Sequence, residues 1–222
     1  MKICNSIKRL FCVKTSTTKL PSDNHAKLLN YHYHPAEFKG RIVGKLLSGL
    51  DLKDYVYEGW RFRHDFCPVC HNTLVPTPPD NYVFRKRTGD VWVSYDGFYI
   101  VSTRFKKFCE EQGFPNLIFV PIVSSKGYFF FMTNEIFKFD HIRSDVLFIT
   151  KRACCGNYDE IIGEPRFQSP IEKKDLDNFI CRDEYYYGSL YNKNQIIIVG
   201  SKTQELMMQY GLSNLYFIDV YE

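Results

Sequence analysis

Two segments of the chain, residues 98–122 and 196–220, repeat one pattern at a constant offset of 98 residues and without a gap. The identical pairs are Ile100/Ile198, Val101/Val199, Gly113/Gly211, Asn116/Asn214, Leu117/Leu215 and Phe119/Phe217. These positions are those of a strand core, a helix end and a return strand. Unrelated units of this kind would not keep one gapless register, so the pattern predicts an internal duplication.

Each copy reads as a strand, a helix and a second strand. In the first copy, residues 98–101 form an apolar strand, and the hydroxyl of Ser102 or Thr103 can cap the helix that follows. Gly113 suits the left-handed position after a helix end. Residues 117–123 then form the return strand.

The remaining chain predicts further elements. Residues 38, 42, 46 and 50 are apolar and share one helical face, which favours a helix. Strands are predicted at 54–66, 82–84, 91–93, 128–132 and 146–150, and a polar, proline-containing connection at 164–177. The fold class is therefore α+β, with mixed sheets and short helices in two duplicated halves, each holding a cysteine turn and a strand–helix–strand unit. We expect a flexible basic arm at 1–25 and halves at 26–123 and 124–222 that form one compact unit.

Composition narrows the class of protein. Of the 222 residues, 45% are hydrophobic and 17% aromatic, which excludes a disordered chain. The net charge is only +4, weaker than that of dedicated nucleic-acid binders. The start of the chain lacks an export signal, because Lys8 and Arg9 interrupt its apolar residues, and no apolar run approaches a membrane span. We expect a cytoplasmic protein with reduced thiols, and no membrane partner.

The sharpest chemical signal is Cys67-Pro-Val-Cys70. Two thiolates at this spacing on a tight turn can face one cation, which is half of a tetrahedral zinc site. A redox pair is the alternative, but a motif of that kind should open a helix. Here Asn72 and the prolines of residues 75–81 break any helix.

A second, irregular cysteine turn lies at residues 152–156. Arg152 stands where a second Cys-x-x-Cys-Gly motif would have cysteine, while Cys154, Cys155 and Gly156 follow. The sequence predicts a structural zinc site of Cys67, Cys70, Cys155 and one of Cys154 or His71. The alternative is a turn that folds without metal and buries its thiols as small apolar groups.

No convincing catalytic constellation is present. The chain lacks a His–Glu metal helix, a nucleophile elbow, a phosphate-binding loop and a dinucleotide-binding glycine pattern. Cys70 and His71 are neighbours in sequence, which does not give a thiolate–base pair. We therefore predict a protein that is not an enzyme.

The cysteine turns and the segments after them resemble the double-CxxCG motif proteins, bacterial proteins associated with immunity to transferred or contact-delivered toxins. The segment from Tyr99 through Gly113 to Ile122 is also similar to a broader family of polymorphic-toxin immunity proteins. The resemblance covers roughly residues 58–122 and 146–220. The chain departs from the pattern at His71, at Arg152 and in its N-terminal region. The resemblance implies a toxin partner and no catalytic residues.

Two functions from different classes follow. The first is an immunity protein that binds and neutralises a cognate toxin, with an exposed patch at Asp183, Glu184, Tyr185, Tyr186 and Tyr187 as the candidate contact. The second is a zinc-ribbon protein that binds nucleic acid, which predicts steeply salt-dependent binding. A cysteine-dependent enzyme, with a reactive thiol at Cys70, is a third and weaker reading.

Overall fold

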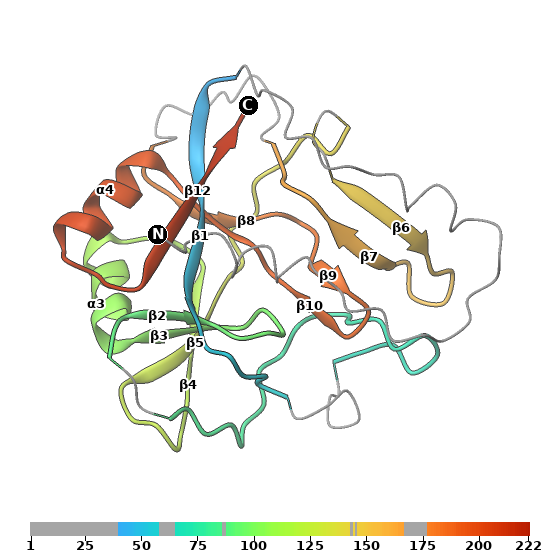
Figure 1. Cartoon of the computed structure of the whole chain (residues 1–222), viewed down its shortest axis with the longest axis horizontal. Helices are drawn as coiled ribbons and strands as arrows, with labels where there is room; N and C mark the ends of the chain where they lie inside the picture. The colour runs from blue at the N-terminus through green and yellow to red at the C-terminus, as the bar shows by residue number, and fades with distance from the viewer. Residues whose placement is uncertain (1–39, 58–64, 86–87, 143, 145, 167–176) are drawn as a thin grey trace.

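The computed structural model describes residues 40–57, 65–85, 88–142, 144, 146–166 and 177–222. It has the α+β class, mostly β-sheet with two short helices (Figure 1). The predicted arm at residues 1–25 lies outside the described residues. The elements are β1 Ile42–Asp51, β2 Val91–Val93, β3 Tyr99–Ser102, α3 Thr103–Gln112, β4 Leu117–Pro121, β5 Tyr128–Thr133, β6 Leu147–Lys151, β7 Tyr158–Ile162, β8 Ile180–Arg182, β9 Tyr187–Ser189, β10 Asn192–Asn194, β11 Ile197–Val199, α4 Ser201–Gln209 and β12 Leu215–Tyr221.

The larger sheet is mixed and curls on itself. Its strand order is β4-β5-β3-β2-β1-β11-β8. In addition, β12 pairs with the edge of β1 that lies opposite β11. Ile136, just after β5, forms a parallel bridge with Arg182 of β8 and so brings the two ends of the sheet together. A smaller four-stranded sheet, β10-β9-β7-β6, lies beside it (Figure 1).

Each repeated segment forms the predicted strand, helix and strand. Ser102 caps α3 by accepting the amide hydrogen of Phe105, and Gly113 ends the helix in the left-handed conformation with φ 68°. Gly211 adopts φ 76° after α4, and Asn116 and Asn214 both have positive φ just before β4 and β12. Residues 98 apart thus adopt matching backbone conformations.

The pairing register also matches. β3 and β4 flank β5, where Phe131 faces Tyr99 on one side and Phe119 on the other. β11 and β12 flank β1, where Leu47 faces Ile197 and Phe217. Both partners of Leu47 lie 98 residues after the corresponding partners of Phe131. The two central strands, β5 and β1, come from different places along the chain. β5 follows its strand–helix–strand unit, whereas β1 precedes both units.

The main core lies between the curled sheet and the two helices. Phe105, Phe108 and Met207 from the helices are almost fully buried against strand residues such as Tyr99 and Val199. Burial of a side chain of this size contributes about 1.5–3 kcal/mol. Since both helices cover the same core, the two halves form one packing unit (Figure 1).

Three local predictions were wrong. The helix at 38–50 is strand β1 from Ile42 onward, because residues four apart share a face in a strand as well as in a helix, and pairing with β11 and β12 decides between them. The described part of 54–66 forms bends and one bridge, Phe66 to Thr73. Residues 82–84 form no strand, and the hydroxyls of Ser124 and Ser125 donate to their carbonyls instead.

Candidate metal centre

Two turns from distant parts of the chain have the same backbone hydrogen bonds. In the first, the amide of Cys67 donates to the carbonyl of Asn72 at 2.8 Å, and His71 donates back to Cys67 at 2.9 Å. In the second, Arg152 donates to Asn157 at 2.7 Å, and Gly156 donates to Arg152 at 2.8 Å.

The fifth residue of each turn has positive φ, 59° at His71 and 75° at Gly156. The first turn precedes β2, and the second joins β6 to β7. The matching conformation places Cys70 and Cys155 at equivalent positions, and Arg152 at the position of Cys67.

The two turns face each other and bring four sulfur atoms together. The Sγ atoms of Cys67 and Cys154 lie 3.8 Å apart, and those of Cys70 and Cys155 lie 3.6 Å apart. All four lie within 4.8 Å of one another. Sulfur atoms that bind one zinc ion tetrahedrally at about 2.3 Å lie about 3.8 Å apart. The spacing therefore suits a metal ion and exceeds the ~2.05 Å of a disulfide bond.

The structure distinguishes between the two alternatives for the fourth ligand. Cys154 lies in the sulfur cluster, with its Sγ 3.8 Å from that of Cys67. His71 packs its ring edge-on against Phe66, with 5.5 Å between the ring centroids. Cys67, Cys70, Cys154 and Cys155 thus form a cluster that could hold a metal ion.

Asn72, which follows the first turn, is buried and connects the sulfur cluster to its surroundings. Its side-chain amide donates to Oδ1 of Asp159 at 2.9 Å and contacts Sγ of Cys70 at 3.6 Å. The same carboxylate of Asp159 binds the guanidinium of Arg152 at 2.7 and 2.6 Å, which raises the pKa of Arg152.

Lys193 approaches from the smaller sheet. Its ammonium group donates to Oδ1 of Asn72 at 2.8 Å and to the carbonyl of Tyr158. Burial lowers the pKa of Lys193 to about 8, against the opposing effect of Asp159, Cys155 and Cys70. Neither Lys193 nor Asn72 was predicted from the sequence, because a lone lysine in Asn-Lys-Asn carries no signal of burial.

The thiols differ in acidity. Burial acts to raise the pKa of Cys70, but hydrogen bonds from the Asn72 backbone and the thiols of Cys154, Cys155 and Cys67 lower it to about 7. The hydrogen bond with Cys70, together with burial, raises the pKa of Cys154 to about 12. Cys70 therefore carries a more acidic thiol than Cys154 does.

The charges around the cluster suit a bound divalent ion. Four thiolates with one zinc ion carry a net charge of −2, and Arg152 and Lys193 lie nearby with positive charge. Cysteine ligands fill all four positions of a tetrahedral ion, so such a site leaves no position open for a substrate. That arrangement is typical of structural zinc.

The other described cysteines are core residues. Cys109 and Cys181 are buried, and burial raises the pKa of both thiols. Cys109 lies on the buried face of α3 beside Phe105 and Phe108. Cys4 and Cys12 lie outside the described residues.

The predicted partner patch, residues 183–187, contains both buried and exposed side chains. Asp183 is fully buried, with Nε2 of His141 at 2.8 Å and the hydroxyl of Tyr187, also buried, at 2.5 Å. Glu184 is exposed, and Tyr185 and Tyr186 keep part of their surface. His141, Asp183 and Glu184 also bring possible ligand atoms within 4.8 Å of one another, but both protein hydrogen bonds already satisfy Asp183.

No family model matches this chain, and no curated protein matches it either. Among the described residues, no helix has the length and apolar character needed to cross a membrane.

Proposed function

We propose that this protein is a non-catalytic immunity protein that binds a bacterial toxin and blocks it, and that its four cysteines hold a structural zinc ion. The observation that carries the proposal is the meeting of two cysteine turns 87 residues apart, at Cys67 and Cys154. The resemblance to the double-CxxCG motif proteins rests in part on these two turns. A zinc site in which four sulfur atoms fill the coordination sphere stabilises the fold, and it has no open position at which a substrate could bind the metal.

Zinc would act here as a cross-link. It joins the segment around Cys67 to the β6–β7 hairpin, which otherwise contact each other through a few side-chain hydrogen bonds such as Asn72 to Asp159 and Asn157 to the carbonyl of Thr73. Metal binding to a site that exists only in the folded chain adds its binding free energy to folding. The smaller sheet is then held in place as a surface for a partner.

We infer further that the two halves arose by duplication. The equal registers around Phe131 and Leu47 support this, as do the matching turns at Cys67 and Arg152. On this reading the second turn lost its first cysteine, and Cys154 restored the fourth sulfur ligand. The scaffold was retained while the surfaces of the halves diverged.

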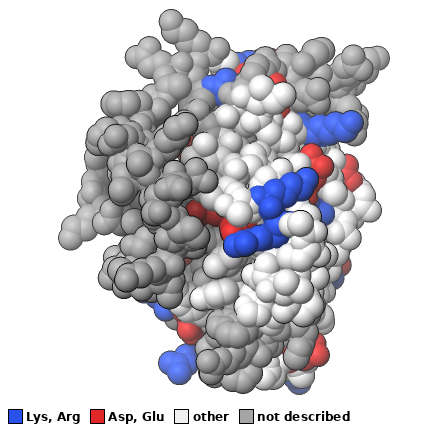
Figure 2. Space-filling model, turned by 90° about the vertical axis from the view of Figure 1, so that its right-hand side faces the viewer, with Lys and Arg blue, Asp and Glu red and all other residues white. Residues whose placement is uncertain are grey.

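A protein partner fits the surface better than nucleic acid does. On the face shown in Figure 2, Lys and Arg side chains lie beside Asp and Glu among uncharged residues, without a continuous basic surface among the described atoms. Nucleic-acid binding depends on such a surface and weakens steeply with salt. The alternative is a zinc-ribbon protein that binds nucleic acid, and the experiment must distinguish it from a toxin-binding protein.

The test is co-expression with the toxin encoded beside this gene. The proposal predicts restored growth and a stoichiometric complex of the two purified proteins. A Cys67→Ser/Cys154→Ser variant serves as the metal-deficient comparison and should protect less, because it folds less stably. Absence of both rescue and complex overturns the proposal. Tight, salt-sensitive binding to DNA or RNA without toxin binding would favour the alternative.

A further inference from the structure

A hollow of about 950 Å³ lies between the segment that follows β1 and the segment that precedes β2. Its walls carry three tyrosines, Tyr55, Tyr57 and Tyr82, and two prolines, Pro78 and Pro79. The volume is in the range of about 300–1,000 Å³ that ligand sites occupy. We call it the Tyr–Asp hollow, because three aspartates also line it.

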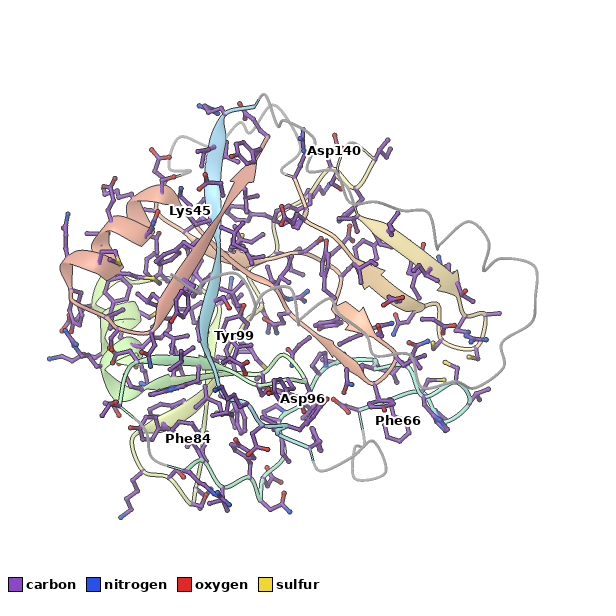
Figure 3. The ribbon with its side chains drawn as sticks, viewed as in Figure 1. Lys45, Phe66, Phe84, Asp96, Tyr99 and Asp140 are labelled. Atoms are coloured by element: carbon purple, nitrogen blue, oxygen red, sulfur yellow. The ribbon has the colours of Figure 1, made fainter. Side chains whose placement is uncertain are left out.

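The first wall is fixed by a buried carboxylate. Asp96, labelled in Figure 3, accepts the amide hydrogens of Val56 at 3.0 Å and Tyr57 at 3.1 Å. Ser94 donates a third hydrogen bond to it at 2.6 Å. Three hydrogen bonds to one buried charge hold the backbone of this wall in place before any ligand arrives.

The second wall is tied to the first and to the core. The hydroxyl of Tyr57 donates across the hollow to the carbonyl of Thr77 at 2.6 Å. Tyr82 packs on Phe130, and its carbonyl accepts a hydrogen bond from Ser124 at 2.8 Å. The intervening prolines fix φ and so limit the freedom of the chain. A site held in this way loses little entropy when it binds.

Among the described residues, the charged side chains that line the hollow are mostly acidic. Asp54, Asp65 and Asp80 line it together with the guanidinium of Arg85. Asp80 is exposed, and the Asp54 carboxylate accepts a hydrogen bond from the amide of Tyr55 at 2.9 Å. Carboxylate oxygens that are not occupied by hydrogen bonds within the protein are available to bind a cationic ligand.

Two of the lining residues expose large apolar side chains to solvent. Tyr55 keeps 49% of its surface exposed and Val83 keeps 63%. Large apolar side chains gathered around a polar depression mark interaction sites. They extend the contact area beyond what a small molecule in the hollow would use.

We infer that the Tyr–Asp hollow binds a positively charged peptide segment of a partner protein. A lysine or arginine head group would lie between the carboxylates, its stem would cross the tyrosine rings, and neighbouring residues would cover the exposed apolar side chains. The inference deepens the proposed function and rests on it for the identity of the partner, the toxin. The recognition chemistry rests on the hollow alone.

The experiment measures peptide binding by calorimetry at low salt. The probes are an arginine- and lysine-rich nonapeptide, a nonapeptide with glutamate at the same positions, and free arginine amide. The basic peptide should bind, and Asp54→Asn, Asp80→Asn and Tyr55→Ala should each weaken it about fivefold, as expected for an exposed charge or cation–π contact of about 1 kcal/mol. Glu110→Gln, an exposed carboxylate on α3, is the matched control and should leave binding unchanged.

The outcomes separate the inference from the proposed function. Peptide binding without toxin neutralisation overturns the proposed function and supports the peptide site in the hollow. If all three hollow variants still neutralise the toxin and the basic peptide does not bind, the peptide site in the hollow is overturned. The proposed function is then supported. Equal affinity for free arginine amide and for the peptide contradicts a peptide site, and equal weakening by Glu110→Gln shows that the attraction is only general charge.

Discussion

The ammonium group of Lys193 lies 2.8 Å from Oδ1 of Asn72, although 121 residues separate them. Asn72 uses its amide nitrogen for Asp159, so one buried side chain connects β10, β7 and the first cysteine turn. Two strands of the smaller sheet are thus joined to the first cysteine turn by polar contacts beside the sulfur cluster. A buried network of this kind is costly to disrupt, because each lost partner leaves another polar group unsatisfied.

The first prediction concerns the pH dependence of Lys193. Its pKa is near 10.5 in an unfolded chain and about 8 in the fold. Between these values the unfolded chain holds a proton that the folded chain has released, so the free energy of unfolding should rise as pH rises from 8 to 10.5. Urea denaturation across this range measures the slope, and Lys193→Met should reduce it.

The lysine contribution is the difference between the two slopes, since the cysteines titrate in both proteins. Lys193→Arg, which stays protonated throughout this range, is the charge-preserving control and should also lose the lysine contribution. Equal slopes in wild type and Lys193→Met would show that Lys193 keeps an ordinary pKa in the fold.

The second prediction identifies the metal ligands. Purified protein should carry about one zinc ion per chain, and Cys67→Ser and Cys154→Ser should each lose most of it. His71→Gly should retain zinc, because His71 lies outside the sulfur cluster and glycine accepts its φ of 59°. Elemental analysis gives the stoichiometry, and cobalt(II) substitution reports the number of thiolates. Loss of zinc in His71→Gly but not in Cys154→Ser would assign the fourth position to histidine.

The sequence was most informative where structure is local. The repeated segments predicted β3, α3, β4, β11, α4 and β12. The sequence offered Ser102 or Thr103 as the cap of α3 and Gly113 as its end, and the structure has Ser102 and Gly113 there. Each signal there comes from residues within one turn or one strand of each other. The four predicted cysteines also come together in one cluster that could hold a metal ion, because a Cys-x-x-Cys spacing is itself a local signal.

What the sequence missed depends on distant pairing. The strands β8, β9 and β10 have three residues each, too few for a periodic signal, and pairing with neighbouring strands defines them. β1 was predicted as a helix, because spacing of four residues fits both structures. Burial of Lys193 and the walls of the Tyr–Asp hollow depend on contacts between segments that no local pattern encodes.

The third prediction concerns Asp90, which joins the two halves. Its carboxylate accepts hydrogen bonds from Ser102, the cap of α3, at 2.6 Å and from the amide and hydroxyl of Ser213 at 2.9 and 3.0 Å. Asp90→Asn turns an amide group toward these donors and should lower the free energy of unfolding by about 2–4 kcal/mol. Urea denaturation measures the loss. The exposed Asp54→Asn is the control and should change stability by less than about 0.5 kcal/mol; equal losses would show that burial of Asp90 is unimportant.

The fourth prediction compares the two helix ends. Gly113 and Gly211 have φ 68° and 76°, and an added Cβ meets nothing within 4 Å at Gly113 but lies 3.0 Å from the Arg104 guanidinium at Gly211. Gly113→Ala should cost about 1 kcal/mol from the left-handed backbone alone. Gly211→Ala should cost the same plus the displacement of Arg104, whose guanidinium donates to the carbonyl of Tyr210 at 2.5 Å. Thermal or urea unfolding of Gly211→Ala in an Arg104→Ala background isolates that contact: there the two glycine costs should become equal. A difference that survives the removal of Arg104 would mean that the two helix ends, despite their matching φ values, are not equivalent.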